Sequence, residues 1–523
     1  MSQDVIIIGS GINSLVCAAI LAKKGKKVSL FERSNNLGGC IQSEFVEDCV
    51  IDTFSTAYPL FVTSAAYPIL KDDLANEGVQ FVSNTVPTGV LTSDLKWTIL
   101  KTDRNANIEA YNQLKEGEGD RFDEQMNWVM QHSEILFNIL GSELMTFKMG
   151  RFLGKYIWKN GIANASANAQ EFLKSVKDDL PNHFSSKELL ANLAPWVLHS
   201  GLSPESPLSS TMAKVTAMSI EMVGLPLVQG GSYKIVNAFK AIIEKNGGKC
   251  HTNAPVAKII SDSKGYVEGI ELANKEIHLA KHVVANVTPT QLYGSLLKDD
   301  NLVSNKVKNQ AKQYKYGKGN MQIHLVLKES PQWVQPALKD VTYVHLTDGI
   351  DDVSKAVNEA SRQELPSKAT ICIAQPTAVD STRAKDGKSV LWIQLPECPN
   401  YPIGDANSEL NHLCQGEWTE ELKESYSNKI LERISKYIPN LLDTIIYKKV
   451  MSPKDLADAN INLVHGDPYS GQCNMDQYLL WRPLSSVKNH ETPIKNLYHI
   501  GASTHPGPGL SGGSGYLVSQ KIK

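Results

Sequence analysis

The first 32 residues constrain the fold more than any other part of the chain. Asp4–Ile8 ends in an unbroken apolar run that is typical of a buried parallel strand. Gly9-Ser10-Gly11 follows directly, and Ile12–Lys24 carries small and apolar residues at helical spacing. A second apolar strand, Lys27–Phe31, comes next. The pattern predicts a strand–helix–strand unit whose two strands are parallel.

The residue types around the turn of this unit fit a dinucleotide. Gly9 allows a tight turn, and Gly11 lets the backbone approach a pyrophosphate. The helix N-terminus supplies free N–H groups and the positive end of the helix dipole. Glu32, at the end of the second strand, can accept hydrogen bonds from both ribose hydroxyls. Ser14 replaces the third glycine of the fingerprint, and its small side chain still allows close helix–strand packing.

The residues after the second strand favour FAD over NAD. Glu32-Arg33 and Gly38-Gly39 resemble the ER-x(4)-GG extension of the glutathione-reductase-like FAD superfamily. That resemblance implies that the paired glycines pass close to the cofactor phosphates and ribityl chain. Cys40 and Cys49 do not have the C-x(4)-C spacing of a redox-active pair, so we interpret Cys17 and Cys40 as packing residues.

Two later segments are expected to complete the cofactor site. Gly230-Gly231 precedes a predicted helix, and the strand that begins at Val256 is expected to meet the adenine through its backbone. A strand at Leu497–Ile500 leads into the glycine-rich segment 501–513. So many glycines between a strand and a helix indicate close backbone approach to another group, here the flavin ring. Backbone N–H groups there would stabilise negative charge that develops on flavin reduction. The residues expected to bind FAD are Gly9, Gly11, Ile12, Asn13, Ser14, Glu32, Arg33, Gly38, Gly39, Val256, Asn286, Gly501, Ala502, Gly509, Leu510 and Ser511.

The order of these segments resembles the carotenoid (phytoene) desaturase/isomerase superfamily of FAD oxidoreductases. Ala194–His199, Ala285–Gln291 and Trp481-Arg482-Pro483 make the chain most similar to the phytoene-dehydrogenase-like NAD(P)/FAD-dependent branch. The resemblance implies an α/β fold: a glutathione-reductase-like FAD-binding Rossmann domain with an inserted α+β substrate domain. The FAD-binding domain is expected to be discontinuous, at 1–70, 225–300 and 455–523. The substrate-binding or lid domain is expected at 71–224 and 301–454, with helices at 125–140, 188–198 and 420–438 and strands at 322–327, 370–374 and 390–395.

Few side chains stand out as catalytic. Hydride transfer to flavin from a hydrocarbon requires a positioned C–H bond and excluded water, but no protein base. His505, in the glycine-rich segment, is the candidate for a catalytic side chain, although it can equally serve to bond the cofactor or backbone. We expect His199 to be structural and Arg383 to be a solvated turn residue. No metal-ligand spacing is present, so no metal is expected.

Three functions remain open on the sequence. The first is an FAD-dependent oxidoreductase that desaturates or isomerises an apolar, polyene or lipid-like substrate, with oxygen or a quinone as candidate electron acceptors. The second is a flavin amine oxidase, and the third is an FAD-stabilised binding module without activity. A net charge of −2 over 523 residues does not suggest a nucleic-acid partner. The sequence shows no export signal and no apolar run long enough to span a bilayer, so we expect a cytoplasmic protein.

The segment between residues 125 and 160 suggests contact with a membrane surface. Its apolar and aromatic series, from Ile135 to Trp158, is interrupted by Lys148, Arg151, Lys155 and Lys159. Aromatic side chains beside cations suit a lid that rests on a lipid surface. The alternative is an ordinary buried helix pair with basic edges. Peripheral membrane association is therefore a hypothesis of the sequence.

Overall fold

The N-terminal strand lies at the centre of the first sheet. The computed structural model describes residues 3–523. Four further strands lie parallel to β1, two on each side, in the order β9-β2-β1-β12-β20. Their bounds are β1 (Gln3–Ile8), β2 (Val28–Phe31), β9 (Lys249–His251), β12 (Ile277–Asn286) and β20 (Leu497–Ile500). This is the parallel core of a dinucleotide-binding fold, and it confirms the predicted strand–helix–strand unit.

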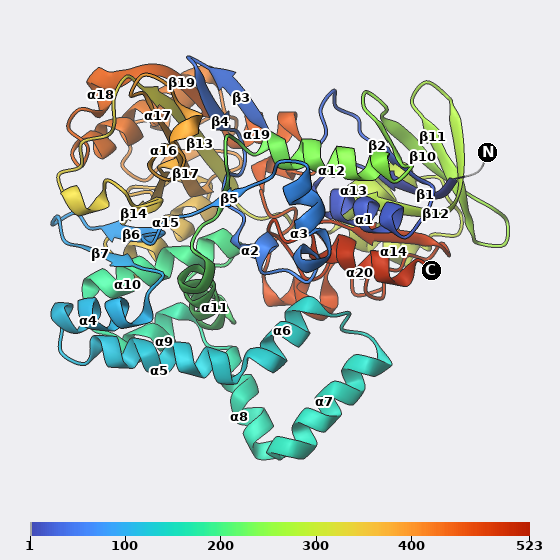
Figure 1. Cartoon of the computed structure of the whole chain (residues 1–523), viewed down its shortest axis with the longest axis horizontal. Coiled ribbons are helices and arrows are strands. Elements are labelled where there is room, and N and C mark those ends of the chain that lie inside the picture. The colour runs from blue at the N-terminus through green and yellow to red at the C-terminus, as the bar shows by residue number, and fades with distance from the viewer. Residues whose placement is uncertain (1–2) are drawn as a thin grey trace.

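Both faces of this sheet are covered (Figure 1). Val5 and Ile7 pack in a core with helices α1 (Ile12–Lys23), α12 (Tyr233–Lys245) and α20 (Gly513–Lys521). Ile6 and Ile8 point to the opposite face. The first half of β12 also continues antiparallel into β11 (Val267–Leu272) and β10 (Val256–Ser261).

A second, mixed sheet stands beside the first. Its order is β19-β13-β17-β16-β14-β6-β7. The bounds are β6 (Thr88–Leu91), β7 (Trp97–Leu100), β13 (Gly319–Leu327), β14 (Tyr343–Leu346), β16 (Ile371–Ala374), β17 (Ser389–Cys398) and β19 (Ile445–Met451). Alternate residues such as Ile323 and Ile393 pack in a core with helix α17 (Glu420–Ser435). The residues between them face the other way, which positions the site described below.

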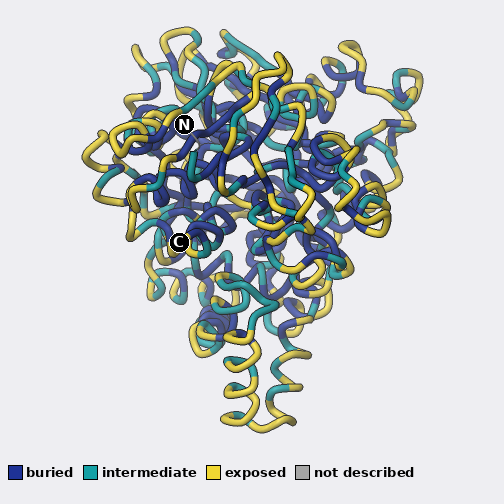
Figure 2. The backbone as a smooth tube through the Cα atoms, turned by 90° about the vertical axis from the view of Figure 1, so that its right-hand side faces the viewer, coloured by how far each residue is buried: buried dark blue, intermediate teal, exposed yellow. Residues whose placement is uncertain are grey.

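A group of helices lies beneath the second sheet, and two of them leave the body of the protein (Figure 1). The group contains α4 (Arg104–Leu114), α5 (Glu118–Gln131), α6 (Ser133–Gly141), α9 (Val176–His183), α10 (Lys187–Leu193), η1 (Ala194–Ser200) and α11 (Ser209–Val223). Helices α7 (Phe147–Asn160) and α8 (Ile162–Phe172) form the projection at the bottom of Figures 1 and 2, which is mostly exposed.

Short elements connect these parts. The remaining strands are β3 (Ser43–Val46), β4 (Cys49–Asp52), β5 (Phe81–Val82), β8 (Leu227–Val228), β15 (Glu364–Leu365) and β18 (Gly404–Asp405). The remaining α-helices are α2 (Pro59–Val62), α3 (Tyr67–Asn76), α13 (Pro289–Gln291), α14 (Asn305–Lys312), α15 (Ile350–Ser361), α16 (Pro376–Val379), α18 (Leu441–Thr444) and α19 (Pro453–Ala459). Across residues 3–523, no helix is both long and apolar enough to cross a membrane.

The predicted fold class is confirmed, with local differences. The expected helix at 125–140 breaks at His132 into α5 and α6. The expected helix at 188–198 continues past Leu193 only as the 3₁₀ turn η1, because Pro195 cannot donate a helical hydrogen bond. The predicted domain boundaries stay a prediction. Strands of the first sheet fall at 3–31, 249–286 and 497–500, and those of the second at 88–100 and 319–451.

Candidate active site

One cavity of about 1210 Å³ lies against the carboxyl ends of β1 and β12 and extends to the second sheet. Its lining draws on segments that are far apart in the sequence. Of the residues expected to bind FAD, all line this cavity except Ser14 and Gly501. Those two lie behind the wall, where Asn286 connects them. Its Nδ2 donates to Ser14 Oγ at 2.9 Å, and a Cβ on Gly501 would lie 2.4 Å from its Oδ1.

The start of α1 has the free backbone groups that a phosphate needs. Gly11 is the N-cap residue and offers no side chain to the first turn, so the first N–H groups of the helix stay available. A Cβ on Gly11 would lie 3.2 Å from Asn286 Nδ2, and one on Gly39 would lie 3.1 Å from the Cα of Gly11. The cradle is therefore lined by bare backbone.

The acidic residue after β2 is held in place by its neighbours. Glu32 Oε2 accepts hydrogen bonds from the backbone N and the hydroxyl of Ser10, at 2.9 and 2.6 Å. Its Oε1 accepts from Ser34 N at 2.9 Å. Glu32 is buried and lines the cavity, as the recognition of a ribose requires. The cradle, the helix end and this carboxylate fit the pyrophosphate and ribose of FAD.

Arg482 fixes the glycine-rich segment, a role that the sequence did not reveal. Its Nε and one terminal nitrogen donate to the carbonyl of Ala502 at 2.9 and 2.8 Å. It also donates to Tyr469 O at 2.9 Å, and the side chain is almost completely buried. Five donors in one rigid group can hold several carbonyls at once. The motif that contains Arg482 was visible, but nothing in its sequence indicated these partners.

His505 is not among the residues that line the cavity, although the next residue, Pro506, does line it. Its side chain is buried, and burial lowers its pKa to about 4. Its carbonyl accepts a hydrogen bond from His490 Nε2 at 2.8 Å. This placement favours the alternative role, in which His505 supports the backbone of the segment. Its catalytic role stays an untested prediction.

The prediction that Arg383 is a solvated turn residue is wrong. Arg383 is not solvated but among the largest fully buried side chains. It donates to Asp52 Oδ2 at 2.7 Å, to Asp380 Oδ2 at 3.1 Å and to Val228 O at 2.8 Å. Asp380 also accepts from Gly230 N. The local sequence resembled a polar turn because two of the three partners of Arg383, Asp52 and Val228, are distant in the chain. The ion-pair group fastens the second sheet to the Gly230 turn.

The second sheet contributes a wall of side chains. Gln322 (β13), Tyr343 (β14), and Trp392 and Gln394 (β17) line the cavity, each at an alternate position of a buried strand. Trp196, from η1, stacks on Tyr343 with ring centroids 6.3 Å apart, and Trp392 meets Tyr343 edge to face at the same separation. Among the described lining residues, the only Asp, Glu, Lys or Arg are Glu32 and Arg33. The rest of the wall carries no formal charge.

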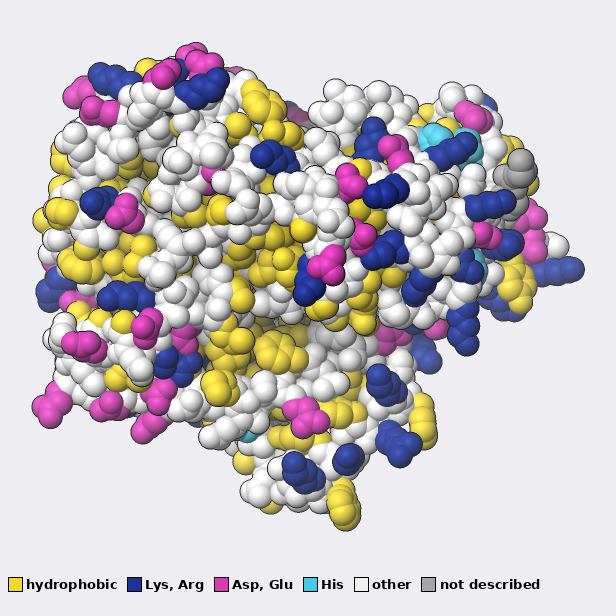
Figure 3. All heavy atoms as spheres, in the orientation of Figure 1, with side chains coloured by type: hydrophobic (Ala, Val, Ile, Leu, Met, Phe, Trp, Pro, Cys, Tyr) yellow, Lys and Arg dark blue, Asp and Glu magenta, His cyan; other side chains and the backbone are white. Residues whose placement is uncertain are grey.

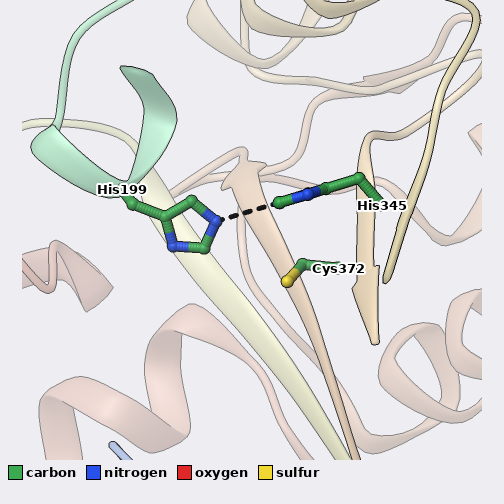
Figure 4. Close-up of side chains that lie close together, drawn as sticks. All are labelled: His199, His345 and Cys372. Carbon is green, nitrogen blue, oxygen red and sulfur yellow. Dashed lines mark hydrogen bonds between the residues drawn. The ribbon is translucent and has the colours of Figure 1, made fainter. Parts of the chain in front are cut away.

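One polar cluster lies beside this wall (Figure 4). His199 lines the cavity, and its Nε2 is 3.2 Å from Nε2 of His345. Cys372 lies opposite His345 in the β14–β16 pair, and its Sγ lies within 4.8 Å of a ring nitrogen of each histidine. Burial lowers the pKa of His199 to about 4 and that of His345 well below its usual value, so both rings are neutral at neutral pH. His199 thus faces the cavity, in addition to the structural role expected for it.

Comparison with known proteins agrees with this geometry. Residues 15–509 match the family described as flavin containing amine oxidoreductase. Pyridine nucleotide-disulfide oxidoreductase domain-containing protein 2 of Rattus norvegicus is 24% identical, over 99% of this chain and 94% of that protein. The 4,4'-diapophytoene desaturase (4,4'-diapolycopene-forming) of Methylomonas sp is 22% identical, over 97% and 92%.

A solved structure shows the same fold. The crystal structure of an oxidoreductase from Methanosarcina mazei aligns over 100% of both chains with a TM-score of 0.62 and 16% identity. The cavity, its backbone cradle and the family match lead to one conclusion. The chain belongs to the flavin containing amine oxidoreductase family and is an FAD-dependent oxidoreductase with relatives among the carotenoid desaturases.

Proposed function

We propose that the protein oxidises or isomerises an apolar, polyene or lipid-like substrate. The observation that carries the proposal is the neutral wall of the cavity, where Trp196, Tyr343, Trp392, Met212 and Val215 stand without a charged neighbour in the lining. Each buried CH₂ group of a ligand would gain about 0.8 kcal/mol on leaving water. The relative named as a diapophytoene desaturase supports the same substrate class.

The two sides of the cavity have different roles: the residues near the start of α1 would hold FAD, and the side chains from the second sheet would hold the substrate. When bound, FAD supplies a hydride acceptor at its N5 atom. Gly11, Gly39 and Glu32 would hold its pyrophosphate and ribose, and Arg482 would keep the Ala502 backbone in position. The aromatic residues orient the substrate C–H bond and keep water out. A hydrocarbon needs no protein base, which agrees with the uncharged wall.

Amine oxidation is the second candidate, and the family description favours it. A buried ammonium group is costly unless an anion pairs with it. The described wall near Trp196, Tyr343 and Trp392 offers aromatic faces but no carboxylate. Cation–π attraction is the remaining source of affinity, which ranks this candidate below the first.

Anaerobic mixing of the holoprotein with a panel of polyenes, lipids and amines tests the proposal. Bleaching of the flavin absorption by an apolar compound, with a dehydrogenated product, is the expected result. Bleaching by amines alone would replace the proposal with amine oxidation. If nothing bleaches the flavin, product analysis with pre-reduced enzyme decides whether the double bonds are isomerised without net oxidation, and an unchanged substrate there counts against the proposal.

We also propose that the α7–α8 projection rests on an anionic membrane surface, from which an apolar substrate can enter. Only Met149 of α7 is buried, so the helix is not part of an ordinary buried pair. Phe147 and Trp158 are 89% and 85% exposed, and Ile162 is 78% exposed. Large apolar side chains this exposed, on a projecting element, are uncommon unless a partner covers them.

The charges of α7 support a lipid partner. Lys148, Arg151, Lys155 and Lys159 are exposed, and none of them has an ion-pair partner among residues 3–523. Figure 3 shows lysine and arginine side chains beside apolar ones on this projection. Basic residues near an anionic leaflet contribute about 1 kcal/mol each.

Cosedimentation with liposomes tests this contact. The protein should bind vesicles that contain phosphatidylserine more tightly than pure phosphatidylcholine vesicles. Lys148→Glu with Lys155→Glu should reduce binding by more than tenfold, because two attractive charges become repulsive. Lys264→Glu with Lys275→Glu, on the β10–β12 side, is the matched control. Equal binding by both double variants would overturn the proposal.

A further inference from the structure

The His199–His345 pair determines which hydrogen-bonding group lies beside the side-chain wall of the second sheet and can meet a ligand. A hydrogen bond between two neutral imidazoles needs one N–H donor and one bare nitrogen acceptor. His345 Nδ1 is buried and has no hydrogen-bond partner among the described residues. His199 Nδ1 is not among the buried unpartnered atoms, and His199 lines the cavity. Nδ1 is therefore the nitrogen of His199 that a ligand can reach.

Burial determines which ring nitrogen of each histidine carries the proton. If His199 donated through Nε2, His345 would carry its proton on Nδ1, as a buried N–H without an acceptor. Orphaned N–H groups are rare in protein interiors because their desolvation is costly. If instead His345 Nε2–H donates to His199 Nε2, the buried nitrogen of His345 is a bare ring atom. His199 then carries its own proton on Nδ1, where it faces the cavity.

The unpartnered Nδ1 of His345 also disfavours a metal ion between His199, His345 and Cys372. A metal held by both Nε2 atoms would again put a proton on His345 Nδ1, which lacks the acceptor that metal-bound histidines almost always have. A metal would also require the thiolate of Cys372, and burial raises the pKa of that thiol. The pair fits a hydrogen-bond relay better than a metal site.

His199 thus presents a neutral N–H donor among aromatic residues of the cavity, which Gln322 and Gln394 also line. The Trp196 ring centroid is 4.8 Å from that of His199. A ligand carboxylate would be buried there without a countercharge, which is costly. A hydroxyl would need a second partner for its own proton, whereas a carbonyl oxygen only accepts.

We propose that His199 is a specificity-determining residue that binds a carbonyl oxygen of an otherwise apolar substrate, and that His345 is a positioning residue that fixes its tautomer. This inference rests on the proposed function for the identity of the substrate site, but it concerns binding and not turnover. Within the apolar substrate class, it favours compounds that carry a carbonyl group over the corresponding hydrocarbons.

Binding of three C15 compounds with one skeleton tests the inference. Farnesal, farnesol and farnesene differ in carrying a carbonyl, a hydroxyl or neither. Perturbation of the flavin spectrum under anaerobic conditions gives each Kd. The wild type should prefer farnesal over farnesene by about tenfold, the worth of one hydrogen bond to a buried donor, with farnesol between them.

Variants separate this role from a structural one. His199→Leu should bring the farnesal-to-farnesene preference close to one, and His345→Leu should reduce it. His345→Gln should restore it, because an amide N–H can replace the ring donor. Cys372→Ala is the matched control and should keep the preference. A purely structural role would weaken the binding of all three compounds alike.

Three results would overturn the inference. They are equal or absent binding of farnesal and farnesene by the wild type, an unchanged preference in His199→Leu, and a stoichiometric metal that Cys372→Ala loses. Flavin bleaching tests the proposed function, whereas the binding comparison tests this inference. A carbonyl preference with neither bleaching by any compound nor isomerisation by the pre-reduced enzyme would leave this inference standing and count against the proposed function. Bleaching without the preference would do the reverse.

Discussion

The wall of the cavity expected to bind the cofactor and the wall expected to bind the substrate differ in the atoms that they present. The cofactor wall is mostly backbone: the bare cradle of Gly11 and Gly39, the open end of α1 and the Ala502 segment. The substrate wall is mostly side chains, which project from alternate positions of β13, β14 and β17. A backbone wall tolerates almost no added atom, because nothing in it can rotate away. A side-chain wall can change its chemistry one residue at a time, which suits a fold that hosts many functions.

The largest effect should follow from adding side-chain atoms to the backbone wall. Gly11→Val should abolish FAD binding, because the added side chain would block the approach of the pyrophosphate to the backbone, and its Cβ would already lie 3.2 Å from Asn286 Nδ2. The measurement is the flavin absorption of the purified protein. The control is Gly154→Val in α7, where a Cβ would meet nothing within 4 Å. This variant should keep the flavin absorption band. A normal flavin band in Gly11→Val would contradict the assignment of this wall to the cofactor.

Arg383 fastens the second sheet to the Gly230 turn, and its loss should be nearly as harmful. Arg383→Leu leaves Asp52 and Asp380 buried without their cation, which should lower the free energy of unfolding by about 3–5 kcal/mol. Chemical denaturation measures this change. Arg362→Leu removes an exposed partner of Glu364 and should cost no more than about 0.5 kcal/mol. Equal losses in the two variants would mean that Arg383 does not hold the buried carboxylates of Asp52 and Asp380 as described.

The histidines of the interior should make stability depend on pH. Burial lowers the pKa of His199 to about 4 and of His324 to about 3, below the usual value of about 6.5. Between about pH 6.5 and 4 the unfolded chain therefore binds protons that the folded chain does not. Each such histidine makes the free energy of unfolding fall by about 1.4 kcal/mol per pH unit as the pH drops through this window. Above it, their contribution is constant.

A variant isolates the contribution of His199. Between pH 7 and pH 5, His199→Leu should lose about 2 kcal/mol less of its unfolding free energy than the wild type does. Denaturation at the two pH values measures the difference. His412→Leu, which removes an exposed histidine, should follow the wild type. A wild-type slope in His199→Leu would show that His199 is charged in the folded protein.

A smaller effect should follow from placing charge on the substrate wall. Met212 lines the cavity and is only partly buried, so Met212→Asp should fold and keep FAD. The carboxylate should weaken binding of an apolar ligand by about tenfold, because its hydration is lost when the ligand covers it. Met212→Leu conserves volume and should bind within about twofold of the wild type. Unchanged affinity in Met212→Asp would place the substrate elsewhere.

The difference between the walls also explains what could be predicted from sequence. The backbone wall depends on local motifs, so Gly9, Glu32 and the Ala502 segment could be proposed from the sequence, and most of the predicted residues line one cavity. The sheet assignments of Gln322–Leu327 and Val390–Leu395 followed from apolar runs in the same way.

The substrate wall could not be predicted, because its members meet only through sheet register. Gln322 and Gln394 are opposite each other in the β13–β17 pair but 72 positions apart in the chain. The signal was a polar or aromatic residue at alternate positions of a buried strand, as in Gln322-Ile323-His324. Arg383 was misjudged for the same reason, since Asp52 and Val228 lie far from it in sequence.

The most direct test of the account compares a neutral and a positively charged compound that share one carbon skeleton. Farnesene and farnesylamine share one skeleton, and the rate of anaerobic flavin reduction by each can be followed in a stopped-flow instrument. An uncharged substrate wall predicts that the hydrocarbon reduces the flavin and that the ammonium compound does so far more slowly or not at all. Faster reduction by farnesylamine would contradict the account and make the protein an amine oxidase.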